Sequence, residues 1–154
     1  MDDDEAHLRQ AIALARSNVE AGGRPFGAVL VHDGVVVATG VNTIVSSLDP
    51  TGHAELNAVR AASAALGTAD LSGCAVYASG HPCPMCMAAM RLAGISEVTF
   101  ACSNEDGEPY GLSTAAIYAD LAKPFARQSM RIRHLPIVGA TDLYEEWSCR
   151  TAQR

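Results

Sequence analysis

The fold is decided by residues 75–90, which read AVYASGHPCPMCMAAM. Ala75 to Ser79 is a short apolar run and predicts a buried strand. Pro82-Cys83-Pro84 then opens a helix that continues through Met90 and ends near Gly94. A buried strand that leads at once into a helix is typical of layered α/β domains.

The sequence on either side continues this alternation. Upstream, the patterns predict a helix over 7–19, two strands over 26–31 and 35–39 joined by the turn Asp33-Gly34, and a helix from about His53 to Leu66. Downstream, they predict a strand over 97–101, a helix over 113–121, a last strand or extended segment over 131–137, and a helix over 142–150. We therefore expect one α/β domain over residues 1–154, a three-layer α/β/α fold around a mixed sheet of about five strands.

Composition excludes several classes of protein. The 154 residues are 49% hydrophobic and 18% charged, which is typical of a folded globular chain. The acidic start is followed by no apolar segment, and no run approaches membrane-spanning length, so we expect a cytoplasmic protein with no membrane partner. The net charge of −6, with no basic run, argues against nucleic acid as a partner.

Cysteine usage indicates a metal site. Five cysteines, an odd number, in a reducing compartment argue against a disulfide framework. Cys83 and Cys86 lie three apart at a helix start, so they face the same way and can chelate one ion. The remaining three, Cys74, Cys102 and Cys149, are expected to be small buried side chains.

His53 supplies the third ligand and lies about thirty residues before Cys83. Three protein ligands leave one position of a zinc ion (Zn2+) open for water, as catalytic sites do. Glu55, two residues beyond His53, is poorly placed to share the ion but well placed to meet that water. We therefore predict that Glu55 is the catalytic residue that carries the proton.

The combination of H-x-E with P-C-x-x-C is the signature of the zinc base deaminases. The chain resembles the cytidine-deaminase-like superfamily, and within it the bacterial guanine-deaminase branch most closely. The resemblance covers nearly the whole chain and is carried by the stretches Pro25–Val29, Gly40–Asn42, Asp49–Glu55 and Pro82–Cys86. It implies a cytidine-deaminase-like fold and a zinc-dependent aminohydrolase that acts on a free nucleobase, with guanine as the first candidate.

The resemblance also implies substrate contacts. Asn42 should hydrogen-bond the base, Phe26 should pack on its ring, and the backbone at Ala54 should help to hold it. The C-terminal segment, about 138–154, should close the active site, in some relatives that of a dimer partner. A homodimer, domain-swapped through this segment, is therefore expected. Its contributors to the pocket are Asp142, Tyr144 and Trp147, although Trp147 could instead pack against a partner.

Two positions depart from the pattern. His81 stands where the relatives usually carry glutamate, and it either lines the pocket, replaces a supporting carboxylate or simply packs. An acidic residue of the C-terminal segment should contact guanine, but Asp142, Glu145 and Glu146 are all candidates for that role. Tyr110, in the loop from Gly107 to Gly111, either reaches the pocket or faces solvent.

Three other functions remain open from sequence alone. Cytosine, isoguanine, azacytosine and aminotriazines share the amino-azine ring and could replace guanine as the small-molecule heterocyclic substrate. A tRNA adenosine deaminase would share the zinc motif but should present a basic face to RNA. A structural zinc protein should show a fourth protein ligand, such as Cys74, His81 or Cys102.

Overall fold

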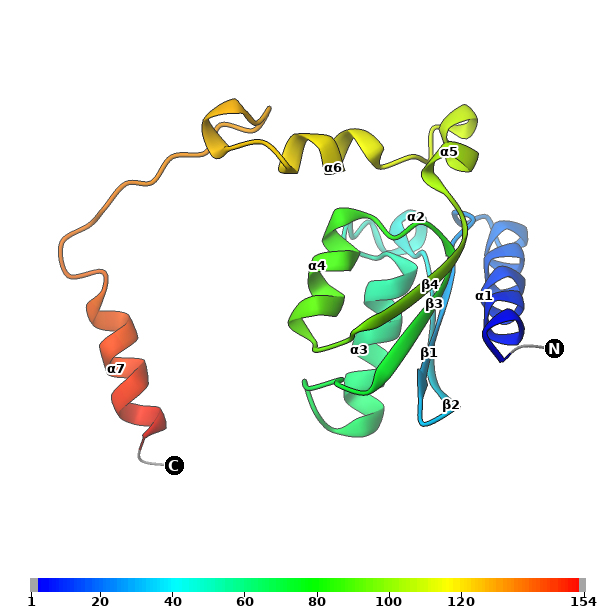
Figure 1. Cartoon of the computed structure of the whole chain (residues 1–154), viewed down its shortest axis with the longest axis horizontal. Helices are drawn as coiled ribbons and strands as arrows, with labels where there is room; N and C mark the ends of the chain where they lie inside the picture. Colours follow the sequence, from blue (N-terminus) through cyan, green and yellow to red (C-terminus); the bar gives the residue numbers. More distant parts are fainter. Residues whose placement is uncertain (1–2, 153–154) are drawn as a thin grey trace. The chain divides into compact units, whose positions relative to one another are not determined.

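The computed structural model describes residues 3–152 and divides into two compact units, one up to Ala119 and one from Asp120. The first unit contains a mixed four-stranded sheet (Figure 1). Its strand order is β2 (Val35–Val41), β1 (Gly27–His32), β3 (Cys74–Gly80) and β4 (Glu97–Cys102). β1 pairs antiparallel with both neighbours, while β3 and β4 run parallel. The predicted α/β layering is confirmed.

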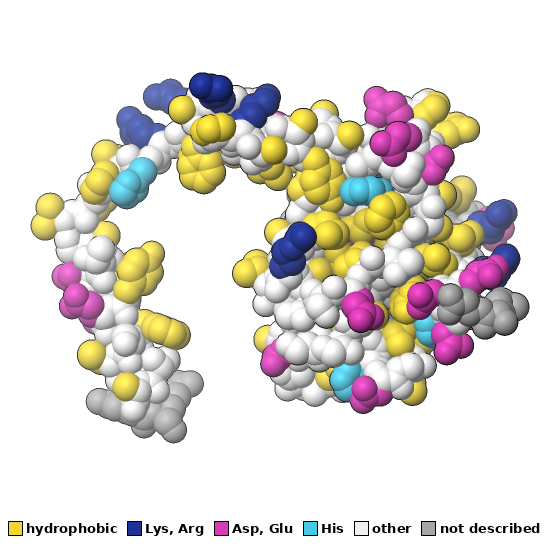
Figure 2. Space-filling model, in the orientation of Figure 1, with side chains coloured by type: hydrophobic (Ala, Val, Ile, Leu, Met, Phe, Trp, Pro, Cys, Tyr) yellow, Lys and Arg dark blue, Asp and Glu magenta, His cyan; other side chains and the backbone are white. Residues whose placement is uncertain are grey.

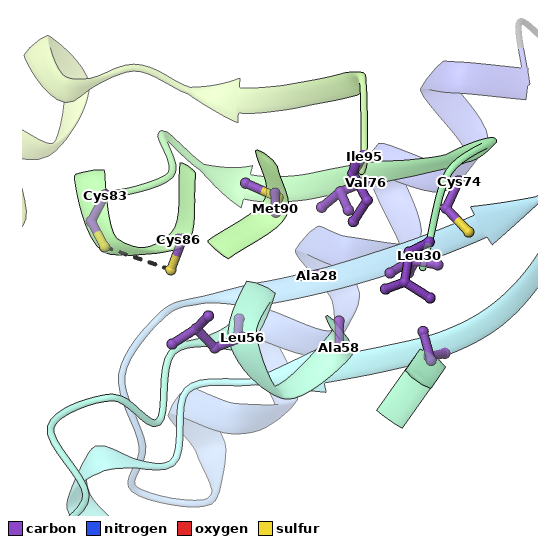
Figure 3. Close-up of a cluster of buried hydrophobic side chains, with 14 residues drawn as sticks. Ala28, Leu30, Leu56, Ala58, Cys74, Val76, Cys83, Cys86, Met90 and Ile95 are labelled. Atoms are coloured by element: carbon purple, nitrogen blue, oxygen red, sulfur yellow. Dashed lines mark hydrogen bonds between the residues drawn. The ribbon is translucent and has the colours of Figure 1, made fainter. Parts of the chain in front are cut away.

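Helices cover both faces of this sheet (Figure 1). α1 (Asp3–Glu20) lies on one face, and α3 (Ala54–Leu66) and α4 (Pro84–Leu92) lie on the other. Each face buries its own cluster. The larger, between the sheet and α3 and α4, contains Leu30, Val76 and Met90 (Figure 3). The α1 face is filled by Val29, Val31 and Tyr77.

Gly40 sets how closely α3 approaches the sheet. A Cβ at this position would stand 2.2 Å from the Ala54 carbonyl oxygen and 2.6 Å from the Ala58 nitrogen. Only glycine therefore lets the first turn of α3 lie directly on β2. This contact matters because the residues predicted to do the chemistry begin the same helix.

Several short elements complete the secondary structure. They are α2 (Ile44–Ser47), α5 (Asn104–Gly107), the 3-10 turns η1 (Glu108–Tyr110) and η2 (Phe125–Arg127), and α6 (Ala115–Leu121), which spans the boundary between the units. The sequence predicted only α6 among them. One-turn helices lack hydrophobic periodicity, and α5 instead depends on a capping box between Ser103 and Asp106.

The second unit carries α7 (Asp142–Thr151), which begins after Thr141 as predicted. Residues 131–137 form no ladder, so the sheet of the described chain has four strands rather than about five. A strand is defined by its pairing, and this segment has no strand partner within residues 3–152. Every residue from 129 to 152 is exposed. Figure 2 shows hydrophobic side chains along its surface. The large exposed hydrophobic residues of this segment include Leu135, Val138, Leu143, Tyr144 and Trp147.

The structure also shows where the three cysteines outside the predicted metal site lie. Cys74 is buried as predicted, but Cys102 and Cys149 are exposed, because the edge strand β4 and the helix α7 leave them uncovered. Within residues 3–152, no helix is both long and apolar enough to cross a membrane.

Candidate active site

Three predicted metal ligands meet where two helices begin. His53 is the N-cap of α3, Cys83 is the N-cap of α4, and Cys86 lies in the first turn of α4. The Cys83 Sγ lies 3.3 Å from the His53 Nδ1 and 3.5 Å from the Cys86 Sγ, and the Cys86 Sγ lies 3.6 Å from the same Nδ1. Figure 3 shows both thiols at the end of the larger core cluster.

This triad fits zinc. Sulfur and nitrogen ligands bound to a tetrahedral zinc ion stand about 3.5–3.8 Å apart, close to the three distances observed here. In the part of the chain that the structure describes, no fourth histidine, cysteine or carboxylate joins the group. Three ligands from two helix starts leave one coordination position for another molecule, which is the arrangement of a catalytic site rather than a structural one.

The triad also favours the thiolate that a metal needs. Hydrogen bonding with Cys86 and with His53 lowers the pKa of Cys83 to about 4. The same bond to Cys83, together with burial and the nearby Glu55, raises the pKa of Cys86, so Cys86 keeps the shared proton. Metal binding displaces that proton, because only the deprotonated sulfur is a ligand.

Glu55 lies beside the triad and is buried, with 6% of its surface exposed. Its Oε2 accepts a hydrogen bond from the Cys86 Sγ at 3.4 Å. Burial is the largest influence on this carboxyl group and raises its pKa. A raised pKa makes a carboxyl group a better proton acceptor, and a general acid–base residue must both take up and return a proton.

A pocket opens over this cluster. Its lining consists of Arg24, Phe26, Asn42, His53, Ala54, Glu55, His81, Cys83, Leu112 and Thr114. Four of the five substrate residues predicted from the first unit are thus brought together, namely Phe26, Asn42, Ala54 and His81. Tyr110 is 78% exposed and lines an adjoining cavity, which shares Phe26, His81 and Leu112 with the first. Asp142, Tyr144 and Trp147 lie on α7 and are exposed.

Sequence reasoning missed three lining residues. Leu112 and Thr114 belong to an irregular loop after η1, where no pattern marks which side chains turn inward. Arg24 could have been found, because it directly precedes the Pro25-Phe26 pair that the resemblance had already selected.

Asn42 is held in a defined orientation. Its Oδ1 accepts a hydrogen bond from the Ile44 backbone nitrogen at 3.1 Å, and its own backbone nitrogen donates to the Phe26 carbonyl at 3.1 Å. The amide oxygen is therefore already hydrogen-bonded within the turn, and the amide nitrogen is the group that can donate to a ligand. A buried donor of this kind suits an acceptor atom on a ring.

His81 is also fixed by its neighbours. Its ring stands edge-on to Phe100 and Tyr118, with centroids 4.6 and 5.3 Å away. Its Nδ1 lies 3.0 Å from the Pro82 carbonyl oxygen, to which the Tyr118 hydroxyl also donates. Because a carbonyl only accepts, Nδ1 must carry the hydrogen, and the Nε2 of the neutral ring is left as an acceptor.

A helix-borne His-Cys-Cys triad with a buried glutamate beside it, on an α/β/α sheet, defines the class of hydrolytic zinc deaminases. Residues 1–102 match the family model described as the cytidine and deoxycytidylate deaminase zinc-binding region. The chain belongs to this family and is a zinc-dependent deaminase, and thus a hydrolase.

Individual relatives support the assignment to this family. The guanine deaminase of Bacillus subtilis is 36% identical over 93% of this chain and 92% of its own length. A solved structure of guanine deaminase from Bacillus subtilis matches with a TM-score of 0.89 and covers 94% of this chain and 93% of that one. The tRNA-specific adenosine deaminase of Aquifex aeolicus is 29% identical over 93% of this chain and 92% of its own.

Proposed function

We propose that this deaminase removes the exocyclic amino group from a free nucleobase or a related amino-azine, with guanine as the first substrate. The observation that carries the proposal is the pocket over the triad. It combines an aromatic ring, Phe26, and an oriented amide donor, Asn42, with the buried acid Glu55. The similarity to guanine deaminase over nearly the full length of both chains supports guanine among the possible bases.

His53, Cys83 and Cys86 would hold the zinc ion, which when bound makes water acidic enough to act as a nucleophile near neutral pH. Glu55 takes a proton from the attacking water as its oxygen bonds to the ring carbon that carries the amine. Glu55 delivers this proton to the ring nitrogen. It then takes the second proton of the former water from the new hydroxyl group and delivers it to the departing amine. Ammonia leaves and an oxo group replaces it on the ring.

The remaining pocket residues orient the base. Phe26 offers a face against which a flat heterocycle can stack. The Asn42 amide nitrogen donates to a ring acceptor, and the His81 Nε2 accepts from a ring N–H. These two groups have opposite hydrogen-bonding character, so together they favour a ring that presents both an acceptor and a donor.

We further propose that the C-terminal segment closes the pocket of a second copy in a homodimer. The support is the second unit itself, whose residues 129–152 are all exposed although many are apolar, Leu143, Tyr144 and Trp147 among them. Apolar surface of this extent is stabilised when a partner covers it. Asp142 at the start of α7 is then available to contact the base.

A tRNA adenosine deaminase is the second candidate, and one observation favours it. Lys123, Arg127, Arg131 and Arg133 are all exposed on the second unit, where Figure 2 shows cationic side chains gathered. The net charge of −6 still opposes affinity for a phosphate backbone. Salt-sensitive binding to an anticodon stem-loop would favour this candidate.

The proposal is tested with a panel of free bases at steady state, with ammonia release as the readout. Guanine, cytosine, isoguanine, azacytosine and aminotriazines are compared with the anticodon stem-loop. We expect turnover of at least one free base, with guanine the best, and none of the RNA. Inactivity toward every free base, in protein shown to contain zinc, would overturn the proposal.

A further inference from the structure

Arg24 is a cation in the pocket to which no role has been assigned. It lies in the turn between α1 and β1, is partly buried, and lines the pocket together with Glu55 and His53. The Asn18 amide nitrogen donates to the Arg24 carbonyl at 2.7 Å, which anchors the backbone of this turn. Within residues 3–152, no carboxylate forms an ion pair with its guanidinium.

The guanidinium lies within electrostatic range of the ligand triad. Arg24 lines the same pocket as the ligands His53 and Cys83. With zinc bound, two thiolates balance the ion, so Glu55 and Arg24 are the remaining charges of the pocket lining. A substrate oxygen with partial negative charge would meet repulsion from Glu55 alone, and Arg24 offsets that repulsion.

Guanidinium chemistry narrows what this residue can recognise. Arginine has five N–H donors and no acceptor, and it stays charged at every working pH. It therefore pairs with an oxygen acceptor and cannot pair with an amino group, which offers only donors in the ring plane. Amino-azines differ from one another in this respect, because each ring position carries either an oxo or an amino group.

We propose that Arg24 is a specificity residue that hydrogen-bonds an oxo group of the substrate and so selects oxo-bearing amino-azines over all-amino analogues. This inference rests on the proposed function, since it names the substrate feature that the same pocket reads. Guanine and 2,6-diaminopurine form a matched pair for the test, because they differ in an oxo against an amino group and, with it, in the hydrogen that guanine carries on the adjacent ring nitrogen.

The experiment compares kcat/KM for guanine and 2,6-diaminopurine in the natural protein and in Arg24→Met and Arg24→Lys. A charge-assisted hydrogen bond contributes about ten- to a hundredfold. We expect Arg24→Met to lower kcat/KM for guanine by that factor and to lower kcat/KM for 2,6-diaminopurine much less. The ratio of the two kcat/KM values should therefore fall. Arg24→Lys keeps the positive charge but lacks the paired planar N–H donors of the guanidinium group. It should therefore retain part of the preference for guanine. Equal losses on both substrates would overturn the inference.

Binding provides a readout that does not depend on turnover. In a Glu55→Gln background, calorimetry measures the dissociation constants of 8-azaguanine and of its analogue with an amine in place of the oxo group. Arg24→Met should weaken the oxo ligand selectively, and an unchanged ratio of the two constants would contradict the role of Arg24. If the natural protein turned over no base but this ratio still shifted, the proposed function would fail while the recognition by Arg24 stood.

Arg16→Met is the matched control. Arg16 is an exposed arginine on α1 and is absent from the pocket lining. Its substitution removes the same charge from the chain and should leave the ratio between the two substrates unchanged. Zinc content and the unfolding temperature of each variant are measured in parallel, so that a damaged fold is recognised as such.

Discussion

At the scale of single residues, Glu55 combines two properties that rarely occur together. It is almost fully buried, yet among residues 3–152 the one side chain in hydrogen-bond contact with it is the Cys86 thiol. We expect Glu55→Gln to lower kcat by about a hundred- to ten-thousandfold, because glutamine keeps the size and the acceptor oxygen but cannot carry a proton. Bound zinc, measured by elemental analysis, should stay at one equivalent per chain. Near-normal turnover would show that another group moves the proton.

Two substitutions of Asn42 distinguish a role in substrate binding from a role in folding. Asn42→Asp keeps the oxygen that accepts from the Ile44 nitrogen but removes the amide N–H donors and adds a negative charge near Glu55. We expect KM for the base to rise about tenfold or more, with little change in unfolding temperature. Asn42→Ala loses the local hydrogen bond as well and should also lower the unfolding temperature. An unchanged KM in the aspartate variant would mean that Asn42 serves only the turn.

At the scale of elements, the contact between β2 and α3 positions half of the site. Gly40→Ala places a methyl group against the backbone of Ala54 and Ala58, so α3 must shift together with His53 and Glu55. We expect unfolding to become easier by about 1–3 kcal/mol and zinc affinity to fall. Thermal unfolding and chelator competition measure the two effects. Thr39→Ala, at the exposed neighbouring position of β2, is the control and should change neither.

The helices and loops also differ in how well the sequence predicts them. The helix starts at His53 and Cys83 were predictable, because Pro84 and the ligand spacing are local signals and the helices are long enough to show periodicity. α2, α5 and the loop that contributes Leu112 to the pocket were not, since their conformation depends on side-chain caps and turns. For 131–137 the sequence left a strand or an extended segment open, and no ladder formed, because strand formation depends on a partner that local sequence does not specify.

At the scale of the whole molecule, the central question is which chain completes each pocket. The second unit exposes its apolar residues, and we have proposed that it closes the site of a second copy. Two inactive variants can test this directly. Glu55→Gln has an intact C-terminal segment and a site that cannot move the proton. Trp147→Ala has an intact site and a C-terminal segment that lacks its largest apolar side chain, which is 68% exposed here.

Mixing the two variants under conditions that exchange subunits should restore turnover if the segment crosses between chains. In a mixed dimer the intact segment of the Glu55→Gln chain closes the intact site of the Trp147→Ala chain, so one of the two sites becomes complete. With equal mixing, half of the dimers are mixed, and about a quarter of the natural activity should return. Light scattering confirms the dimer throughout. If each segment closed its own site, every chain would keep its own defect, and the mixture would be no more active than its parts.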